Sequence, residues 1–198
     1  MARRKQTGRS QAGRLRIVAG NWRSRLLDIA DVEGLRPTSE RIRETLFNWL
    51  APTIHGARCL DLFAGTGALG LEALSRGARE AVFVEQSPVA ARQLEANIGI
   101  VGAQAAANVV QGDGLRYLGS APAGSFDIVF LDPPFAADLL DETCRLLAEN
   151  RLLADGGLVY LEMERTQDDP SLPDGWQVLK NKKAGNVRYM LVQTGENA

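Results

Sequence analysis

A short acidic and aromatic motif, Asp132-Pro133-Pro134-Phe135, follows the apolar run Phe126–Leu131. Consecutive prolines lack backbone N–H donors and fix φ, so the local main chain accepts hydrogen bonds but hardly donates them. The Asp132 carboxylate and the Pro133 carbonyl can therefore accept both hydrogens of a planar amino group, while the Phe135 ring stacks on its plane. The motif thus indicates a site for a flat group with an exocyclic amine, such as a nucleobase.

A glycine-rich loop, Gly65-Thr66-Gly67-Ala68-Leu69-Gly70, follows a second apolar run, Cys59–Phe63, and opens an expected helix. The G-x-G-x-x-G pattern lets a ligand approach the backbone closely, but alone it does not distinguish between cofactors. Glu85 ends the next expected strand, where an acidic side chain can accept both hydroxyls of a ribose. Asp113 follows a third expected strand and could contact an adenine amine.

Two cofactors fit these positions, a dinucleotide and S-adenosylmethionine. Asp61 precedes the loop and favours S-adenosylmethionine, because a carboxylate there complements amino and sulfonium charges but repels a pyrophosphate. The two prolines favour the same donor, since a dinucleotide-dependent oxidoreductase does not explain them. Phe63 and Thr66 flank the same turn and complete the candidate donor-binding residues.

The elements that must position these residues alternate between strand and helix patterns from Arg58 onward. This order predicts an α/β fold with an open, mainly parallel sheet, whose ligands bind at the carboxyl ends of the strands. The later expected strands are Ala81–Glu85, Asn108–Gln111, Phe126–Leu131 and Gly157–Glu162. Trp176–Leu179 and Val187–Val192 alternate like a terminal antiparallel pair, with Lys180, Lys182 and Lys183 in the connection between them.

The segment before the sheet predicts a small N-terminal β-hairpin extension with a basic face, formed by Leu15–Val18 and Trp22–Ile29. A loop at 34–37 follows, and Thr38 or Ser39 can cap the next helix. We therefore expect three parts: a basic tail at 1–13 that is disordered in the free protein, the hairpin extension at 14–36, and the domain that carries the motifs at 37–198.

The charge of the chain is distributed unevenly, although its net value is only −1. No acidic residue precedes Asp28, and that stretch carries Arg3, Arg4, Lys5, Arg9, Arg14, Arg16, Arg23 and Arg25. A basic arm on an otherwise acidic domain indicates a polyanionic partner, most simply nucleic acid. The candidate phosphate contacts are Arg16, Arg23, Arg25, Arg36, Lys180, Lys182 and Lys183.

The composition, with 45% apolar and 24% charged residues in 198, is that of a globular protein with a full core. No apolar run approaches the ~20 residues that cross a bilayer, and the N-terminus lacks the apolar core of a signal peptide. We therefore expect a cytoplasmic monomer with no membrane partner. Cys59, Cys144 and the single histidine, His55, show no metal-ligand spacing, which predicts buried reduced thiols and no metal.

Larger segments resemble the bacterial 16S rRNA guanine-N2 methyltransferases of the RsmD type. The resemblance is carried by Asp61–Ala78, Asp132–Phe135, Arg36–Leu50 and Arg16–Arg23, and it runs from about residue 15 to residue 192. It implies the Rossmann-like fold of class I S-adenosylmethionine-dependent methyltransferases, with a seven-stranded sheet. It also implies S-adenosylmethionine as donor and one guanine of 16S rRNA, within an assembling 30S particle, as substrate.

The resemblance also assigns roles to residues of this chain. Asp61, Gly65 and Gly67 would hold the methionine part of the donor, Glu85 the ribose and Asp113 the adenine side. The target base would lie against Asp132, Pro133 and Phe135.

Other classes account for fewer of these features. Adenine-N6 enzymes acting on DNA share an Asp-Pro-Pro-aromatic motif, but they usually carry a separate target-recognition segment, for which this chain has little room. Glutamine-N5 enzymes favour asparagine where this chain has Asp132. An NAD-dependent oxidoreductase would explain the glycines but not the prolines, and a non-catalytic RNA-binding module would explain the basic arm but not the donor site.

Overall fold

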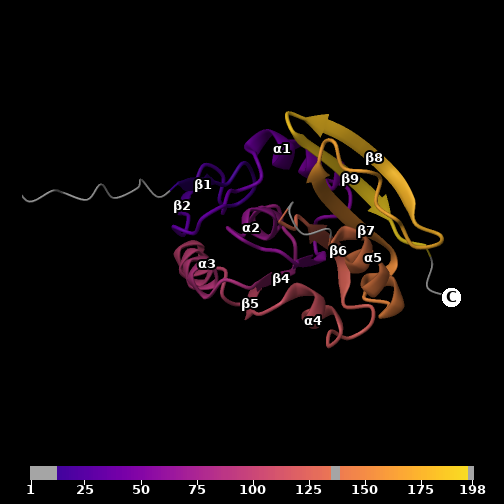
Figure 1. The fold of residues 1–198 in the computed structure, drawn as a ribbon. Coiled ribbons are helices and arrows are strands. Elements are labelled where there is room, and N and C mark those ends of the chain that lie inside the picture. Colours follow the sequence, from indigo (N-terminus) through magenta and orange to yellow (C-terminus); the bar gives the residue numbers. More distant parts are fainter. Residues whose placement is uncertain (1–12, 135–138, 196–198) are drawn as a thin grey trace, which may run out of the picture.

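The computed structural model describes residues 13–134 and 139–195 (Figure 1). The main strands are β3 (Arg58–Asp61), β4 (Glu80–Glu85), β5 (Ala107–Gln111), β6 (Phe126–Leu131), β7 (Leu153–Glu164), β8 (Gln177–Ala184) and β9 (Val187–Gln193). Within the described residues they form one seven-stranded sheet in the order β5-β4-β3-β6-β7-β9-β8. Strands β3 to β7 pair in parallel, whereas β9 is antiparallel to both neighbours. The predicted mainly parallel sheet with a terminal antiparallel hairpin is confirmed.

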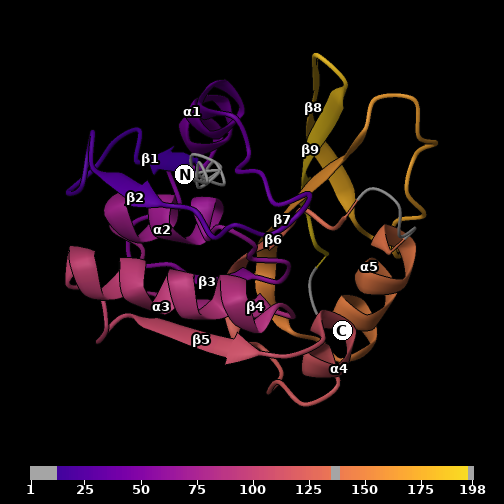
Figure 2. The same cartoon turned by 60° about the vertical axis from the view of Figure 1, so that its left-hand side comes forward.

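Helices cover both faces of this sheet (Figure 2). They are α1 (Glu40–Trp49), α2 (Ala68–Ser75), α3 (Pro88–Val101), α4 (Gly114–Leu118) and α5 (Leu140–Glu149). Side chains of α1, α2 and α3 pack in one apolar cluster, and those of α4 and α5 pack in another. Alternate residues of β6 divide between them: Ile128 joins the first cluster and Val129 the second, as the pleat of a strand requires.

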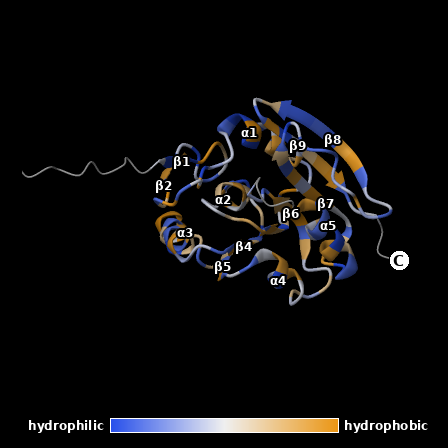
Figure 3. Ribbon diagram, viewed as in Figure 1, coloured by the Kyte–Doolittle hydropathy of each residue, from blue (hydrophilic) through white to orange (hydrophobic). Residues whose placement is uncertain are grey.

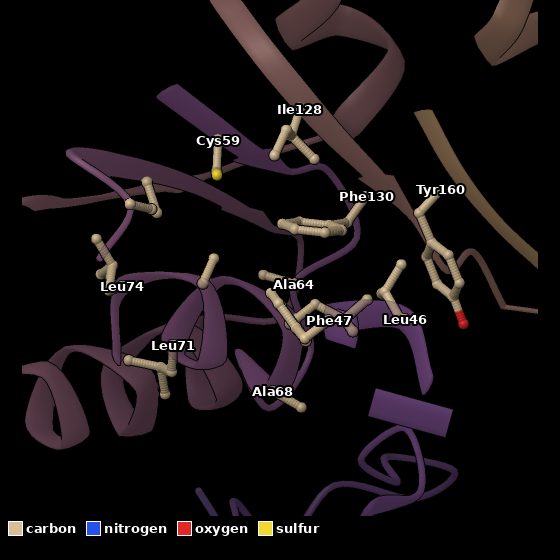
Figure 4. Close-up of a cluster of buried hydrophobic side chains, with 14 of the residues drawn as sticks. Leu46, Phe47, Cys59, Ala64, Ala68, Leu71, Leu74, Ile128, Phe130 and Tyr160 are labelled. Atoms are coloured by element: carbon tan, nitrogen blue, oxygen red, sulfur yellow. The ribbon is translucent and has the colours of Figure 1, made fainter. Parts of the chain in front are cut away.

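Aromatic packing joins α1 to β6 and β7 near the point where β6 ends (Figure 4). The Phe130 ring lies 5.9 Å from the Phe47 ring and 6.5 Å from the Tyr160 ring, measured between centroids. Figure 4 shows Leu46 and Phe47 of α1 facing the same cluster, with the Tyr160 hydroxyl turned away from it. The residues just before α1 are thereby held close to the ends of these strands.

The N-terminal hairpin consists of β1 (Arg14–Arg16) and β2 (Leu26–Asp28), paired antiparallel. Both strands are shorter than predicted, because part of the backbone bonds to α2 instead. The N–H groups of Val18 and Ala19 donate to the Glu72 carboxylate at 2.8 and 2.9 Å. The hairpin is therefore docked against α2, on the face of the sheet that α1, α2 and α3 cover, by buried polar contacts as well as by apolar ones. Its treatment as a separate part at 14–36 stays a prediction.

This docking predicts unequal effects for alanine at two glycines of similar conformation. Gly20 has φ of 82°, and a Cβ there would stand 1.9 Å from the Ser75 carbonyl oxygen. Gly34 has φ of 80° but no neighbouring atom within 4 Å of such a Cβ. We expect Gly20→Ala to lower the free energy of unfolding by roughly 3 kcal/mol. Gly34→Ala should lower it by about 1 kcal/mol, from backbone strain alone. Equal losses in denaturant titrations would contradict the close docking.

The C-terminal lysines lie elsewhere than the sequence predicted. Lys180, Lys182 and Lys183 belong to β8, and only Gly185 and Asn186 separate β8 from β9. Gly185 takes φ of 59°, which allows so tight a turn. The predicted lysine loop is therefore wrong. Lysines on an edge strand deter pairing with another chain, and Figure 3 shows hydrophilic colouring along much of β8.

Other sequence-level expectations can be compared directly with the structure. Cys59 and Cys144 are buried free thiols, as predicted. None of the helices in the described ranges is long and apolar enough to cross a membrane.

Candidate active site

The candidate site lies where the chain reverses its direction of travel across the sheet. From β3 the chain moves outward to β4 and β5, then returns to β6 on the other side of β3. In open α/β sheets such a switch point forms a crevice at the carboxyl ends of the strands. Asp61 ends β3, Glu85 ends β4 and Asp132 directly follows β6. The charges of Glu85 and Asp132 both act on the pKa of Asp61, so the structure brings these predicted residues together.

The glycine-rich loop is held in shape by two of these carboxylates. The Gly65 N–H donates to Glu85 Oε2 at 2.7 Å, and the Gly70 N–H donates to Asp61 Oδ2 at 3.0 Å. Gly67 has φ of 74° at the start of α2, and a Cβ there would meet the Leu94 side chain at 2.4 Å. The positive φ therefore favours glycine at this position, and a Cβ would in addition displace the Leu94 side chain.

Asp61 is the most strongly perturbed of the predicted donor-binding residues. It is 2% exposed, and burial raises its pKa to about 8, with the charges of Asp132 and Glu85 adding to the rise. The Gly70 N–H acts in the opposite direction. A buried carboxylate beside other carboxylates is stabilised when a cation approaches. This set of groups therefore suits a positively charged ligand and disfavours a pyrophosphate.

Other predicted donor-binding residues lie along the same edge. Glu85 Oε1 accepts from the Ser87 N–H at 2.7 Å, so both of its oxygens hold backbone. Asp113 caps α4, accepting from the Arg116 N–H at 2.8 Å. The Phe63 ring lies beside Gly114, where a Cβ would approach it to 3.2 Å.

The Asp132 motif is anchored from outside the sheet. Thr38 Oγ1 donates to Asp132 Oδ2 at 3.0 Å. Burial raises the pKa of Asp132 to about 6, and the Thr38 hydrogen bond works against this rise. Pro133 is buried and Pro134 exposed, whereas Phe135 lies outside the described residues.

A further carboxylate stands beside Asp132 and was not singled out from the sequence. Leu131 of β6 pairs with Leu161 of β7. Asp132 and Glu162 are the next residues along these two adjacent parallel strands, so they lie side by side. Glu162 is 4% exposed and accepts from the Tyr160 hydroxyl at 2.6 Å. Burial and the Asp132 charge raise the pKa of Glu162 to about 8. An acidic residue at the end of the strand next to Asp132 was the available signal.

This raised pKa predicts a change in the pH dependence of stability. The folded protein retains a proton on Glu162 that the unfolded chain releases near its ordinary value of 4.5, so folding loses stability as the pH rises from there to about 8. Glu162→Gln cannot ionise and keeps an acceptor for Tyr160. We expect its melting temperature, relative to the unchanged protein, to increase between about pH 5 and about pH 8. A constant difference in calorimetric melts would show that Glu162 titrates normally.

The predicted RNA-contacting cations lie on separate elements around α1. Arg16 forms an exposed ion pair with Glu40 at 3.6 Å, and Lys182 stands 5.8 Å from the centre of the Trp49 ring. In both ribbon views α1 lies between the β1–β2 hairpin and the β8–β9 pair. All seven predicted phosphate contacts are exposed: Arg16, Arg23, Arg25, Arg36, Lys180, Lys182 and Lys183. Their contact with phosphates stays a prediction.

Across the described residues, no three His, Cys, Asp or Glu side chains are grouped to hold a metal.

This sheet order and these helix positions define a class I S-adenosylmethionine-dependent methyltransferase. A Salinibacter ruber RNA methyltransferase in complex with S-adenosyl-L-homocysteine shares the fold with a TM-score of 0.62 and 16% identity, covering 82% of this chain and 96% of that one. The family model described as conserved hypothetical protein 95 matches residues 15–193.

Close relatives give the family its functional description. The ribosomal RNA small subunit methyltransferase D of Escherichia coli (strain K12) is 47% identical over 190 residues, which cover 96% of this chain and 94% of that protein. Its Haemophilus influenzae namesake is 45% identical and covers 91% of this chain and 94% of its own. A solved Escherichia coli methyltransferase structure superposes with a TM-score of 0.85 at 44% identity, and the match covers 92% of this chain and 99% of that one. The chain belongs to this family, that of the ribosomal RNA small subunit methyltransferases D, as the resemblance predicted.

Proposed function

We propose that this protein transfers a methyl group from S-adenosylmethionine to the exocyclic N2 amine of one guanine in 16S rRNA. The family membership supports the reaction class and the RNA. The observation that carries the proposal is the position of Asp132, directly after β6 and next to the strand that leads into the glycine-rich loop. Donor loop and amine-accepting motif thereby meet at one crevice.

The chain's own groups fit this donor. When bound, S-adenosylmethionine supplies an electrophilic methyl carbon attached to a positively charged sulfur. Asp61, Glu85 and Asp132 bring three carboxyl groups to the crevice, and the positive charge of the donor would favour the ionised form of Asp61. Gly65, Thr66 and Gly67 form the turn beside these carboxyl groups. We assign Phe63 and Asp113 to the adenosine side of the donor.

The acceptor side acts on a weak nucleophile. The lone pair of the guanine amine is delocalised into the ring. Asp132 and the Pro133 carbonyl would accept its hydrogens and favour a pyramidal nitrogen, and we assign Pro134 and Phe135 to the same acceptor motif. Asp132 also stabilises the positive charge that develops on the nitrogen, and the proton then leaves to Asp132 or water. Catalysis on this account is positioning plus electrostatics, without a covalent enzyme intermediate.

The target base must leave its stack, which costs a few kcal/mol. Stacking on an aromatic ring returns about 1–3 kcal/mol. Phosphate contacts from the exposed cations around α1 would contribute further binding free energy, which weakens as the salt concentration rises. We propose that the natural substrate is an assembling 30S particle, met in the cytoplasm by a monomer without a metal.

A labelled-donor assay tests this function. Tritiated S-adenosylmethionine is incubated with unmodified 30S particles, naked 16S rRNA and duplex DNA of matched length. We expect label in the RNA of the particle, less in naked rRNA and none in DNA. Label in DNA would favour the adenine-N6 alternative. Calorimetric binding of NAD in place of S-adenosylhomocysteine would favour an oxidoreductase.

A further inference from the structure

The Arg36-Pro37-Thr38 segment precedes α1 and also contacts the candidate active site through Thr38. Ser39 caps α1, accepting from the Ile42 N–H at 3.3 Å, which leaves the Thr38 hydroxyl for another partner. We propose that Thr38 is a positioning residue for methyl transfer, which orients the Asp132 carboxylate and is itself fixed by a buried Arg43–Glu72 pair tied to the N-terminal hairpin. The inference rests on the proposed function.

The contact between Thr38 and Asp132 constrains the carboxylate directly. Thr38 is 7% exposed, and its hydroxyl donates to Asp132 Oδ2 at 3.0 Å from 94 positions away in sequence. A carboxylate held at one oxygen loses rotational freedom, so its other oxygen is directed by the protein rather than by solvent. A geometry prepared in advance reduces the reorganisation needed when an amine binds.

Arg43 fixes Thr38 through its main chain. Arg43 is 1% exposed and uses all three of its nitrogens. Nε donates to the Thr38 carbonyl at 3.1 Å, Nη1 to Glu72 Oε2 at 3.1 Å and Nη2 to the Arg16 carbonyl at 2.7 Å. The planar guanidinium presents these donors in fixed directions. One side chain therefore connects the loop before α1, helix α2 and strand β1.

Glu72 completes the connection from the opposite side. It is fully buried and accepts from Val18 and Ala19 N–H groups and from Arg76 Nε at 2.8 Å. The hairpin backbone, Glu72, Arg43, Thr38 and Asp132 thus form one continuous series of hydrogen bonds. The same hairpin carries Arg23 and Arg25, two of the cations proposed to meet phosphates. The element that meets RNA is thereby attached to the carboxylate that meets the base.

The pH profile distinguishes positioning from general support. Asp132 accepts most strongly, and opposes the positive charge developing on the amine, when it is ionised, and the Thr38 hydrogen bond favours that form. Its charged or titratable neighbours are Asp61 on β3 and Tyr160 and Glu162 on β7. Burial disfavours the ionisation of Asp132. Loss of the Thr38 hydroxyl therefore shifts the acid limb of kcat toward higher pH.

The test compares Thr38→Val, which keeps the shape without the hydroxyl, with Thr38→Ser, which keeps the hydroxyl. Thr45→Val is the matched control, because Thr45 is a partly exposed residue of α1 whose hydroxyl donates within its own helix, to the Arg41 carbonyl. Tritiated S-adenosylmethionine and unmodified 30S particles are the substrates. We expect Thr38→Val to lower kcat about 10-fold and to move the acid limb upward. Affinity for S-adenosylhomocysteine should be unchanged, with Thr38→Ser and Thr45→Val near the unchanged protein.

A second variant tests the connection through Arg43 and is read only where the protein remains folded. Arg43→Lys retains the charge opposite Glu72 but not the three directed donors, and it should shift the acid limb in the same direction. Folded Thr38→Val or Arg43→Lys with the original kcat and limb would overturn the inference. If the unchanged protein does not methylate the particle, or if Asp132→Asn retains full kcat, the proposed function fails instead.

Discussion

Asp132→Asn reduces kcat for methyl transfer by roughly 10²–10³-fold, with little change in the affinity for S-adenosylhomocysteine, if Asp132 accepts the amine hydrogens. Asparagine keeps the size of the side chain, but its amide N–H₂ presents donors toward a group that also donates. It also removes the negative charge that opposes the positive charge developing on nitrogen. Single-turnover assays with unmodified 30S particles, together with calorimetry, separate these two quantities.

The same strand offers a matched control for this substitution. Asp127 lies at the opposite end of β6 and pairs with Arg58 at 2.7 Å. Asp127→Asn should lower the melting temperature through the lost ion pair and leave kcat unchanged. Equal losses of kcat in both variants would indicate damage to the strand rather than to the chemistry, and the role of Asp132 would then be refuted.

Arg43→Met is expected to have the largest effect on stability. The Arg43–Glu72 pair is buried on both sides, and burial lowers the pKa of Arg43 while the Glu72 charge opposes that shift. Methionine fills similar space but leaves Glu72 with Arg76 as its remaining counter-charge and removes the Arg43 donors from the Thr38 and Arg16 carbonyls. We expect a loss of about 3–5 kcal/mol in the free energy of unfolding. The melting temperature should fall by about 10 °C.

Arg145→Met provides the comparison at the surface. Arg145 forms exposed pairs with Glu142 and Glu149 along α5. Exposed pairs of this kind contribute roughly 0–1 kcal/mol. Similar destabilisation of the Arg43 and Arg145 variants in urea titrations would contradict a structural role for the buried pair.

The central strands could be read from the sequence because parallel strands buried on both faces are short continuous apolar runs. The run Phe126–Leu131 is β6 with the bounds that were expected. The start of α3 has a purely local signal of the same kind, because Ser87 caps the helix and Pro88 occupies its first turn. Local chemistry specifies these features without reference to the rest of the chain.

Other features depend on partners that are distant in sequence and could not be read in this way. Helix α4 is too short to show a helical period, and β8 extends through lysines because its outer edge is unpaired. Arg43 and Glu72 look like solvent-facing positions of two helices until the hairpin covers them. The carboxylates at the ends of β3 and β6 were predicted from motifs, whereas the relation of Thr38 and Glu162 to Asp132 became clear from the structure.

The identity of the methylated nucleoside tests the central claim most directly. Unmodified 30S particles are treated with labelled S-adenosylmethionine and either the unchanged protein or Asp132→Asn, and the RNA is digested and separated. Our account predicts N2-methylguanosine as the labelled product with the unchanged protein and almost none with the variant. Label in N6-methyladenosine, or an equal yield of N2-methylguanosine from both proteins, would contradict it.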